Sequence, residues 1–128
     1  MSDPFIVTSP EQMNSTFARA FNSGKIENLL SLYEANACLV SPEGVPHVGL
    51  AAIRDDLCRL LQLPGRMVSI NRYAFVTEDI ALLQAEFQIL ENETILVRGV
   101  TAEIVRRQPD GRWLYVIDHP AGGLLAFP

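Results

Sequence analysis

The segment Asp79–Leu90, DIALLQAEFQIL, decides the fold class because its apolar residues recur with a period of two. The apolar positions Ala81, Leu83, Ala85, Phe87 and Ile89 alternate with the polar residues Gln84, Glu86 and Gln88. Successive side chains of a strand point to opposite faces, so this pattern is typical of an antiparallel strand with one buried face. The sequence therefore predicts a sheet with a single apolar face that must be covered.

Three further strands are expected next to this segment along the chain. Met67–Val76 precedes it, and Thr94–Arg107 follows it after a turn at Glu91-Asn92-Glu93. The stretch QPDG, residues 108–111, is a strong hairpin signal and leads into a last strand, Arg112–His119. Four long strands joined by such short links form a meander.

The first half of the chain has helical spacing instead and is the only apolar cover available for the sheet. A first helix should begin at SPEQ, residues 9–12, where Ser9 and Gln12 form a capping box, and it should end at Gly24. A second helix is expected from about Lys25 to Glu34, with Tyr33 on its inner side, and a third from Leu50 to Leu63. Two short extended segments separate these last two helices, Ala37–Val40 and Val45–Val48. The predicted class is therefore α+β, with three N-terminal helices packed on a curved antiparallel sheet.

Composition narrows the possible partners. The chain has 128 residues, which fits one domain spanning 1–128. Its net charge is −5 and its basic residues are scattered, which argues against nucleic acid and against an anionic membrane surface as partners. No apolar run approaches the roughly 18 residues that span a bilayer, and the N-terminus lacks the pattern of a signal peptide, so a cytoplasmic protein is the expectation. Cys38 and Cys58 are too few for a disulfide framework or a structural zinc site, and neither a metal nor a cofactor is expected.

Two motifs resemble the nuclear transport factor 2-like superfamily, and within it the SnoaL-like domains. GLAAIR, residues 49–54, is similar to the opening of that family's third helix, and GRWLYVIDH, residues 111–119, is similar to its final hairpin. The resemblance covers nearly the whole chain and implies a cone-shaped, cystatin-like roll around a pocket. Its members include ketosteroid isomerase, polyketide cyclases, epoxide hydrolases, dehydratases and non-enzymatic assembly domains. The resemblance therefore implies the fold and leaves open whether the chain is an enzyme.

The catalytic set of ketosteroid isomerase is incomplete in this sequence. Ser41, directly before Pro42, stands where that enzyme has its aspartate base, and a serine hydroxyl has no useful basicity near neutral pH. Glu43 lies in the same turn, where a solvated carboxylate is the ordinary expectation. The oxyanion-hole acid of the family falls near Glu103, whose pKa a mainly apolar pocket would raise. The donor tyrosine on the first helix has no counterpart, because that face carries Phe17 and Phe21.

The candidate catalytic residues are Glu103, Asp118 and His119, and the candidate ligand-binding residues are Phe17, Phe21, Tyr33, Phe87 and Arg98. Strand parity limits how they combine. Arg98 and Glu103 are an odd number apart and cannot share a face of a regular strand, although a bulge near Gly99 could change that. Only one of Asp118 and His119 should face the pocket, and each could equally serve as a structural hydrogen-bonding group at the end of its strand.

Three functions stay open at this point. The first is a domain that binds a small, apolar molecule in the pocket, with an undetermined reaction. The second is an isomerase, cyclase or hydrolase that uses the pocket carboxylates. The third is a non-enzymatic dimerisation or accessory domain, favoured if Phe17, Phe21, Phe75 and Phe87 close the pocket. A homodimer through the outer surface of the sheet is expected in each case, because relatives with this topology commonly pair there and twofold pairing is the commonest closed arrangement.

Overall fold

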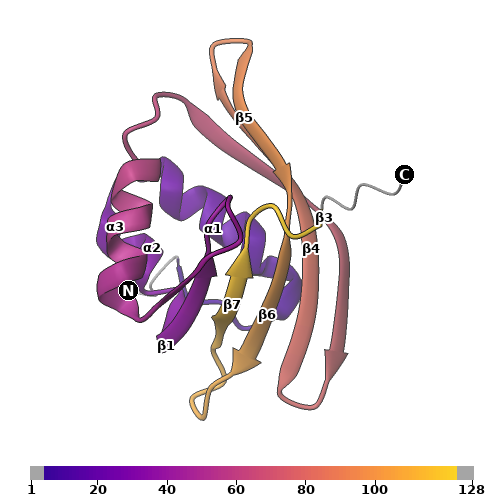
Figure 1. Ribbon diagram of the computed structural model, residues 1–128. Helices are drawn as coiled ribbons and strands as arrows, with labels where there is room; N and C mark the ends of the chain where they lie inside the picture. Colours follow the sequence, from indigo (N-terminus) through magenta and orange to yellow (C-terminus); the bar gives the residue numbers. More distant parts are fainter. Residues whose placement is uncertain (1–4, 124–128) are drawn as a thin grey trace.

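The computed structural model describes residues 5–123 and shows three helices packed against one face of a curved sheet (Figure 1). A short 3-10 helix, Pro10–Gln12, leads into the three helices, which are α1 (Met13–Asn22), α2 (Ile26–Leu30) and α3 (Leu50–Leu60). The seven strands are β1 (Tyr33–Val40), β2 (Pro46–Val48), β3 (Arg66–Thr77), β4 (Ile80–Glu91), β5 (Thr94–Val100), β6 (Ala102–Arg107) and β7 (Trp113–His119). Three of the four predicted long strands and the third helix are therefore present within a few residues of their expected bounds, and the fourth predicted strand, Thr94–Arg107, is divided into β5 and β6.

The strands form one sheet in the order β2-β1-β7-β6-β4-β3, with β5 paired to the remaining length of β4. Every pairing is antiparallel except that of β1 with β7, which is parallel. The expectation of a purely antiparallel sheet was therefore wrong. Strand β1 follows the helices along the chain and joins the meander by running beside its last strand, so the sheet is mixed.

The second helix is shorter than its apolar pattern predicted. It ends at Leu30, and Tyr33 begins β1 instead of completing the helix. The first two residues after the helix turn the chain toward the sheet, where the backbone amide of Tyr115 on β7 donates to the carbonyl of Leu32 at 2.8 Å. This tertiary pairing outweighs a helical pattern that would otherwise run on through Tyr33. The capping box predicted at Ser9 is also absent, since the Gln12 amide reaches the backbone carbonyl of Ser9 instead.

The predicted strand over residues 94–107 is divided at Thr101. The pairing register with β4 is the same on both sides of this residue, from Glu86↔Val100 to Leu83↔Glu103. At the break, the Thr101 hydroxyl oxygen accepts the Ala85 amide at 2.9 Å, so a side chain replaces a carbonyl in the ladder. Residues on either side of Thr101 therefore keep the alternation of one continuous strand.

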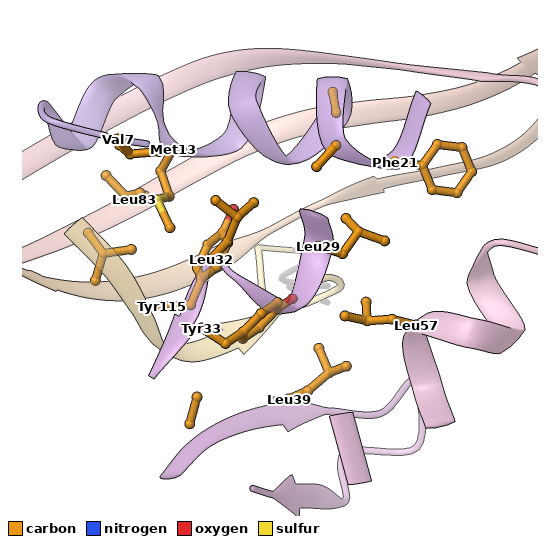
Figure 2. Packing of buried hydrophobic residues seen from close by; sticks show 14 of the residues in the cluster. Val7, Met13, Phe21, Leu29, Leu32, Tyr33, Leu39, Leu57, Leu83 and Tyr115 are labelled. Carbon is orange, nitrogen blue, oxygen red and sulfur yellow. The ribbon is translucent and has the colours of Figure 1, made fainter. Parts of the chain in front are cut away.

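The core lies between the helices and the concave face of the sheet (Figure 2). Met13 and Phe21 from α1, Leu29 from α2 and Leu57 from α3 meet Leu83 and Tyr115 from the sheet. Gly65 makes the close approach that starts β3, because a Cβ atom there would lie 2.4 Å from the Leu90 carbonyl oxygen. Among the described residues, no helix has the length and apolar content needed to span a membrane.

The opposite, outer face of the sheet carries an apolar row across four strands. Strand pairing places Phe75, Leu82, Ile104 and Ile117 side by side. Phe75 is 65% exposed, Leu82 42% and Ile117 38%, so the row is open to its surroundings in the single chain. We refer to these four residues as the outer row.

Candidate functional site

A cavity of about 680 Å³ lies between α1, α3 and the concave face of the sheet. Its walls are mainly apolar and are formed by Phe17, Leu39, Leu57, Leu60, Leu63, Met67, Phe87 and Val97. This volume is in the range of sites that bind small molecules. Phe17 and Phe87, two of the predicted ligand-binding residues, line the cavity. It is not closed off by aromatic rings, because Phe21 packs in the core and Phe75 lies on the outer face.

Two carboxyl groups lie side by side on the floor of this cavity. Glu103 on β6 and Asp118 on β7 are directly paired across the two strands and are only 3% and 5% exposed. Glu103 Oε1 accepts hydrogen bonds from Asn14 Nδ2 at 3.0 Å and from the Thr101 hydroxyl at 2.8 Å. The Tyr33 hydroxyl donates to Asp118 Oδ2 at 2.5 Å. Each carboxyl is therefore held by fixed donors.

Asn14 connects Glu103 to a second buried phenol. The Tyr115 hydroxyl donates to Asn14 Oδ1 at 2.6 Å, which leaves the amide nitrogen of Asn14 to donate to Glu103. The two tyrosine rings pack against each other with their centroids 5.0 Å apart. Tyr33 is therefore not a lining residue of the cavity. It lies behind the floor, where its hydroxyl donates to Asp118, which does line the cavity.

Burial sets the protonation of this pair. Desolvation, followed by the nearby charge of Asp118, raises the pKa of Glu103 to about 8, against the lowering effect of the hydrogen bonds from Thr101 and Asn14. Desolvation also raises the pKa of Asp118, to about 6, against the lowering effect of the Tyr33 hydrogen bond. At neutral pH the pair thus holds one proton, which belongs mainly to Glu103. Since Glu103 Oε1 accepts two hydrogen bonds, Oε2 is the oxygen that carries the proton.

The tyrosines stay protonated beside these carboxyls. Burial, followed by the charges of the two carboxyl groups, raises the pKa of both Tyr33 and Tyr115 well above the ordinary value. Both phenols therefore remain hydrogen-bond donors at any pH at which the protein would work. Together with Asn14 and Thr101, they form a donor shell that leaves the carboxyl pair as the titrating part of the floor.

Asp118 faces the cavity and His119 does not. The ring of His119 packs against Gly122 in the turn after β7, and its Nδ1 atom is buried with no hydrogen-bond partner among the described residues. One of the two was expected to face the pocket, and it is the aspartate.

Strand β7 contains a bulge at Val116. Val116 is an extra residue there, since Ile104 pairs with Ile117 and Val105 pairs with Tyr115. This bulge brings Tyr115 and Asp118 to the same face, which a regular strand would have kept apart.

Arg98 borders the cavity, but its strand position separates it from the floor. Arg98 pairs with Gln88, whose side chain is on the outer face of β4. The inward-facing residues of β4, Phe87 and Leu83, pair instead with Gly99 and Glu103. The expectation that Arg98 and Glu103 lie on opposite faces therefore agrees with the register, and no bulge at Gly99 changes it. Phe21 lies in the core rather than in the lining, because α1 carries it beyond the cavity and into contact with the other helices.

Several residues of the site were missed from the sequence. Asn14 precedes Phe17 by one helical turn, so its place on the inner face of α1 was available from the spacing, but an amide gave no signal of chemistry. Thr101 and Tyr115 were assigned no role.

Ser41 has a structural role in the turn between β1 and β2. It borders the cavity, and its hydroxyl accepts a hydrogen bond from the Val45 amide at 3.1 Å. Within residues 5–123, no group of three or more potential ligands is arranged to hold a metal ion.

Comparison with known proteins agrees with this architecture. The family model of the SnoaL-like domain matches residues 15–116. A candidate ketosteroid isomerase from Parabacteroides distasonis is 18% identical, with a TM-score of 0.72 over 91% of this chain and 94% of that one. A candidate dehydratase of the NTF2-like family from Streptomyces avermitilis is 23% identical, with a TM-score of 0.68 over 89% and 92%.

A third solved structure has the same fold with no assigned activity. It is a domain of unknown function with a cystatin-like fold from Nostoc punctiforme, 17% identical, with a TM-score of 0.74 over 91% of this chain and 76% of that one. At these identities the structural likeness shows the fold alone. A search of curated proteins finds no significant match.

Proposed function

The chain belongs to the SnoaL-like domain family, and we propose that it binds a small, mainly apolar molecule in its cavity and moves a proton on that molecule with Glu103 and Asp118. One observation carries the proposal, namely the two buried carboxyl groups paired on the floor of an apolar cavity. Paired titratable groups whose surroundings separate their pKa values are typical of acid–base sites.

The apolar walls support binding of a ring or short chain. Phe17, Leu57, Met67 and Phe87 can bury the body of such a molecule, and transfer of apolar surface from water favours its entry. The floor then determines its orientation. A carbonyl or hydroxyl group is the part of the ligand that can satisfy Glu103 Oε2, so we expect the polar end to point inward.

The protonation of the pair supports a reaction as well as binding. Glu103, with a pKa of about 8, keeps its proton at neutral pH and can donate a hydrogen bond to a ligand carbonyl oxygen. Asp118, with a pKa of about 6, is mainly ionised and can accept a proton from the carbon next to that carbonyl. Return of the proton to another atom of the ligand completes an isomerisation, and departure of a neighbouring hydroxyl as water completes a dehydration.

A second candidate function is binding without turnover. It is favoured by the donors Tyr33, Asn14 and Thr101, which satisfy carboxyl oxygens of the floor without a ligand. In that case the carboxyl pair would only select and orient the ligand. The two candidates make the same prediction for binding and different predictions for proton exchange.

Deuterium exchange into a bicyclic ketone separates these candidates. We expect 2-tetralone to raise the Tm of the protein and its carbon-bound protons next to the carbonyl to exchange in D₂O about a hundredfold faster with the protein than without it, a typical effect of a positioned base. Asp118→Asn should abolish the acceleration, whereas Glu86→Gln, an exposed carboxylate on the same sheet, should preserve it.

The outcomes of this experiment have distinct meanings. Stabilisation of the protein without faster exchange supports binding without turnover. Equal exchange with the wild type and with Asp118→Asn would exclude Asp118 as the base. If neither 2-tetralone nor a matched series of bicyclic phenols stabilises the protein, the cavity does not bind apolar ring compounds and the proposal fails.

A further inference from the structure

A histidine and an aspartate from different elements meet at the mouth of the cavity. His47 on β2 places its Nδ1 atom 2.6 Å from Asp56 Oδ2 on α3. The other oxygen of Asp56 accepts a hydrogen bond from Arg59, one helical turn further along α3. All three residues border the same cavity that has Glu103 on its floor. This mouth cluster, consisting of His47, Asp56 and Arg59, has no part in the proton transfer described above.

The position of His47 is determined by the short hairpin that carries it. Leu39 on β1 pairs with His47, and Leu39 itself lines the cavity. The turn before β2 is closed by the Ser41 amide, which donates to the Val45 carbonyl at 2.9 Å. After β2, the Gly49 amide donates to the Ala37 carbonyl at 2.9 Å. The imidazole is therefore presented from a paired strand and not from a free loop.

The hydrogen bond to Asp56 fixes the chemistry of the ring. A carboxylate can only accept, so Nδ1 of His47 carries the hydrogen, and Nε2 has a free lone pair when the ring is neutral. The side chain of His47 is 34% exposed and that of Asp56 is 16% exposed, so the carboxylate is the more buried of the two. Within residues 5–123, Nδ1 is the ring nitrogen of His47 that is hydrogen-bonded, so a contact that only ties β2 to α3 would leave Nε2 without a partner on a residue that borders the cavity.

We propose that Nε2 of His47 accepts a hydrogen bond from a neutral O–H group at the outer end of the ligand. This inference rests on the proposed function, because it requires an apolar molecule in the cavity, and it narrows the class of that molecule. The ligand has an apolar body with a polar group at each end, one facing Glu103 on the floor and a hydroxyl group facing His47 at the mouth.

The charges around the mouth favour a neutral hydroxyl over a carboxylate. Asp56 and Glu43 both border the cavity there, and Glu43 is exposed in the turn before β2. The guanidinium of Arg59 is already bound to Asp56. A ligand carboxylate at His47 would therefore approach two like charges, with Arg98 as the second cation that borders the cavity, whereas an alcohol or phenol needs only the lone pair of Nε2.

The two histidines of the chain provide a direct test by NMR. The ring resonances of His47 and His119 can be assigned with His47→Phe and His119→Gln, and His119 then serves as an internal reference outside the cavity. The probes are 2,6-dihydroxynaphthalene, which can donate at both ends, and 2,6-dimethoxynaphthalene, which can only accept. We expect the first probe to shift the His47 resonance and to leave that of His119 in place.

Binding affinities give the second readout. The wild type should bind the dihydroxy probe about fivefold more tightly than the dimethoxy probe, the effect of one hydrogen bond. His47→Phe keeps a ring at the mouth and should bind both probes equally. Asp56→Leu should also lose the preference, because it removes the acceptor that holds Nδ1 as the donor. The acid probe 6-hydroxy-2-naphthoate should bind the wild type more weakly than the dihydroxy probe.

Failure of this inference differs from failure of the proposed function. If the dihydroxy probe shifts the ring resonances of Phe17 and Phe87 but leaves His47 unchanged, the cavity binds ligands and His47 is not a contact. The same conclusion follows if His47→Phe retains the fivefold preference. Tighter binding of the acid probe would replace the neutral hydroxyl by an anionic group. If neither naphthalene probe binds, the proposed function and this inference are both wrong.

Discussion

Replacing Glu103 with glutamine should change how the stability of the protein depends on pH. The substitution keeps the shape of the side chain and removes its titration. The pKa of Glu103 is about 8 in the folded protein, and 4.5 is the reference value for the unfolded chain. Between these values the folded protein keeps a proton that the unfolded chain releases. The free energy of unfolding of the wild type therefore falls as pH rises from 4.5 to 8, and the stability from this group is complete only below pH 4.5.

The size of the effect follows from the proton count. One extra proton bound by the folded state gives a slope of about −1.4 kcal/mol per pH unit. From pH 6 to 8 this amounts to about 2.7 kcal/mol, an upper estimate because the pair titrates together. Asp118, with a folded pKa of about 6, contributes mainly below this window. The difference in free energy of unfolding, Glu103→Gln minus wild type, should thus increase by about 2 kcal/mol from pH 6 to 8.

Urea unfolding at pH 6, 7 and 8 measures this difference, with the single tryptophan, buried Trp113, as the fluorescence probe. Both histidines are present in wild type and variant, so their titration cancels in the comparison. Glu86→Gln removes an exposed carboxylate from the outer face and should follow the wild type at each pH. Parallel pH curves for Glu103→Gln and the wild type would refute a protonated Glu103 on the cavity floor.

Three other substitutions test the surrounding structure. Asn14→Leu should lower the free energy of unfolding at pH 6 by about 2 kcal/mol in the same urea assay, because Glu103 and Tyr115 each lose a buried hydrogen bond. A loss below about 0.5 kcal/mol would contradict the hydrogen bonds of Asn14 to these two residues. Tyr33→Phe removes the hydrogen bond that lowers the pKa of Asp118, so that pKa should rise above 6 in a carbon-13 NMR titration, and an unchanged value would contradict the contact. We also propose that the outer row forms a homodimer interface. Light scattering should then give twice the 14.2 kDa chain mass for the wild type and one chain mass for Leu82→Glu, and a monomeric wild type would exclude the dimer.

The strands could be predicted from the sequence because their signal is local. The alternation within Asp79–Leu90 predicts β4 to within one residue at each end, and Met67–Val76 predicts β3 equally well. The second helix was overextended because its apolar spacing continues through Tyr33, and only the pairing with β7 takes that residue into the sheet. The parallel pairing of β1 was missed for the same reason, since it joins segments about 80 residues apart.

The site could be predicted only in part because its contacts are distant in sequence. Glu103 and Asp118 were identifiable as carboxyls on strands expected to face a pocket. The contacts that hold them were not, since Asn14 lies 89 residues from Glu103 and 101 from Tyr115. The bulge at Val116 also has no sequence signal here, and parity alone would have placed Tyr115 and Asp118 on opposite faces.

The carboxyl of Glu103 is hard to explain as a purely structural group. Keeping it protonated at pH 7, when it would ionise at 4.5 in the unfolded chain, lowers stability by up to about 3.4 kcal/mol relative to a group that does not titrate. A glutamine could accept the same hydrogen bonds from Asn14 and Thr101 through its carbonyl oxygen and would not carry this penalty. A glutamine could not, however, give up a proton and take it back within the pH range in which the protein works. The neighbouring Asp118, with its lower pKa, is the proposed acceptor of the proton from the ligand carbon. We therefore propose proton transfer as the reason for this energetic penalty, and the pH dependence of Glu103→Gln measures the penalty directly.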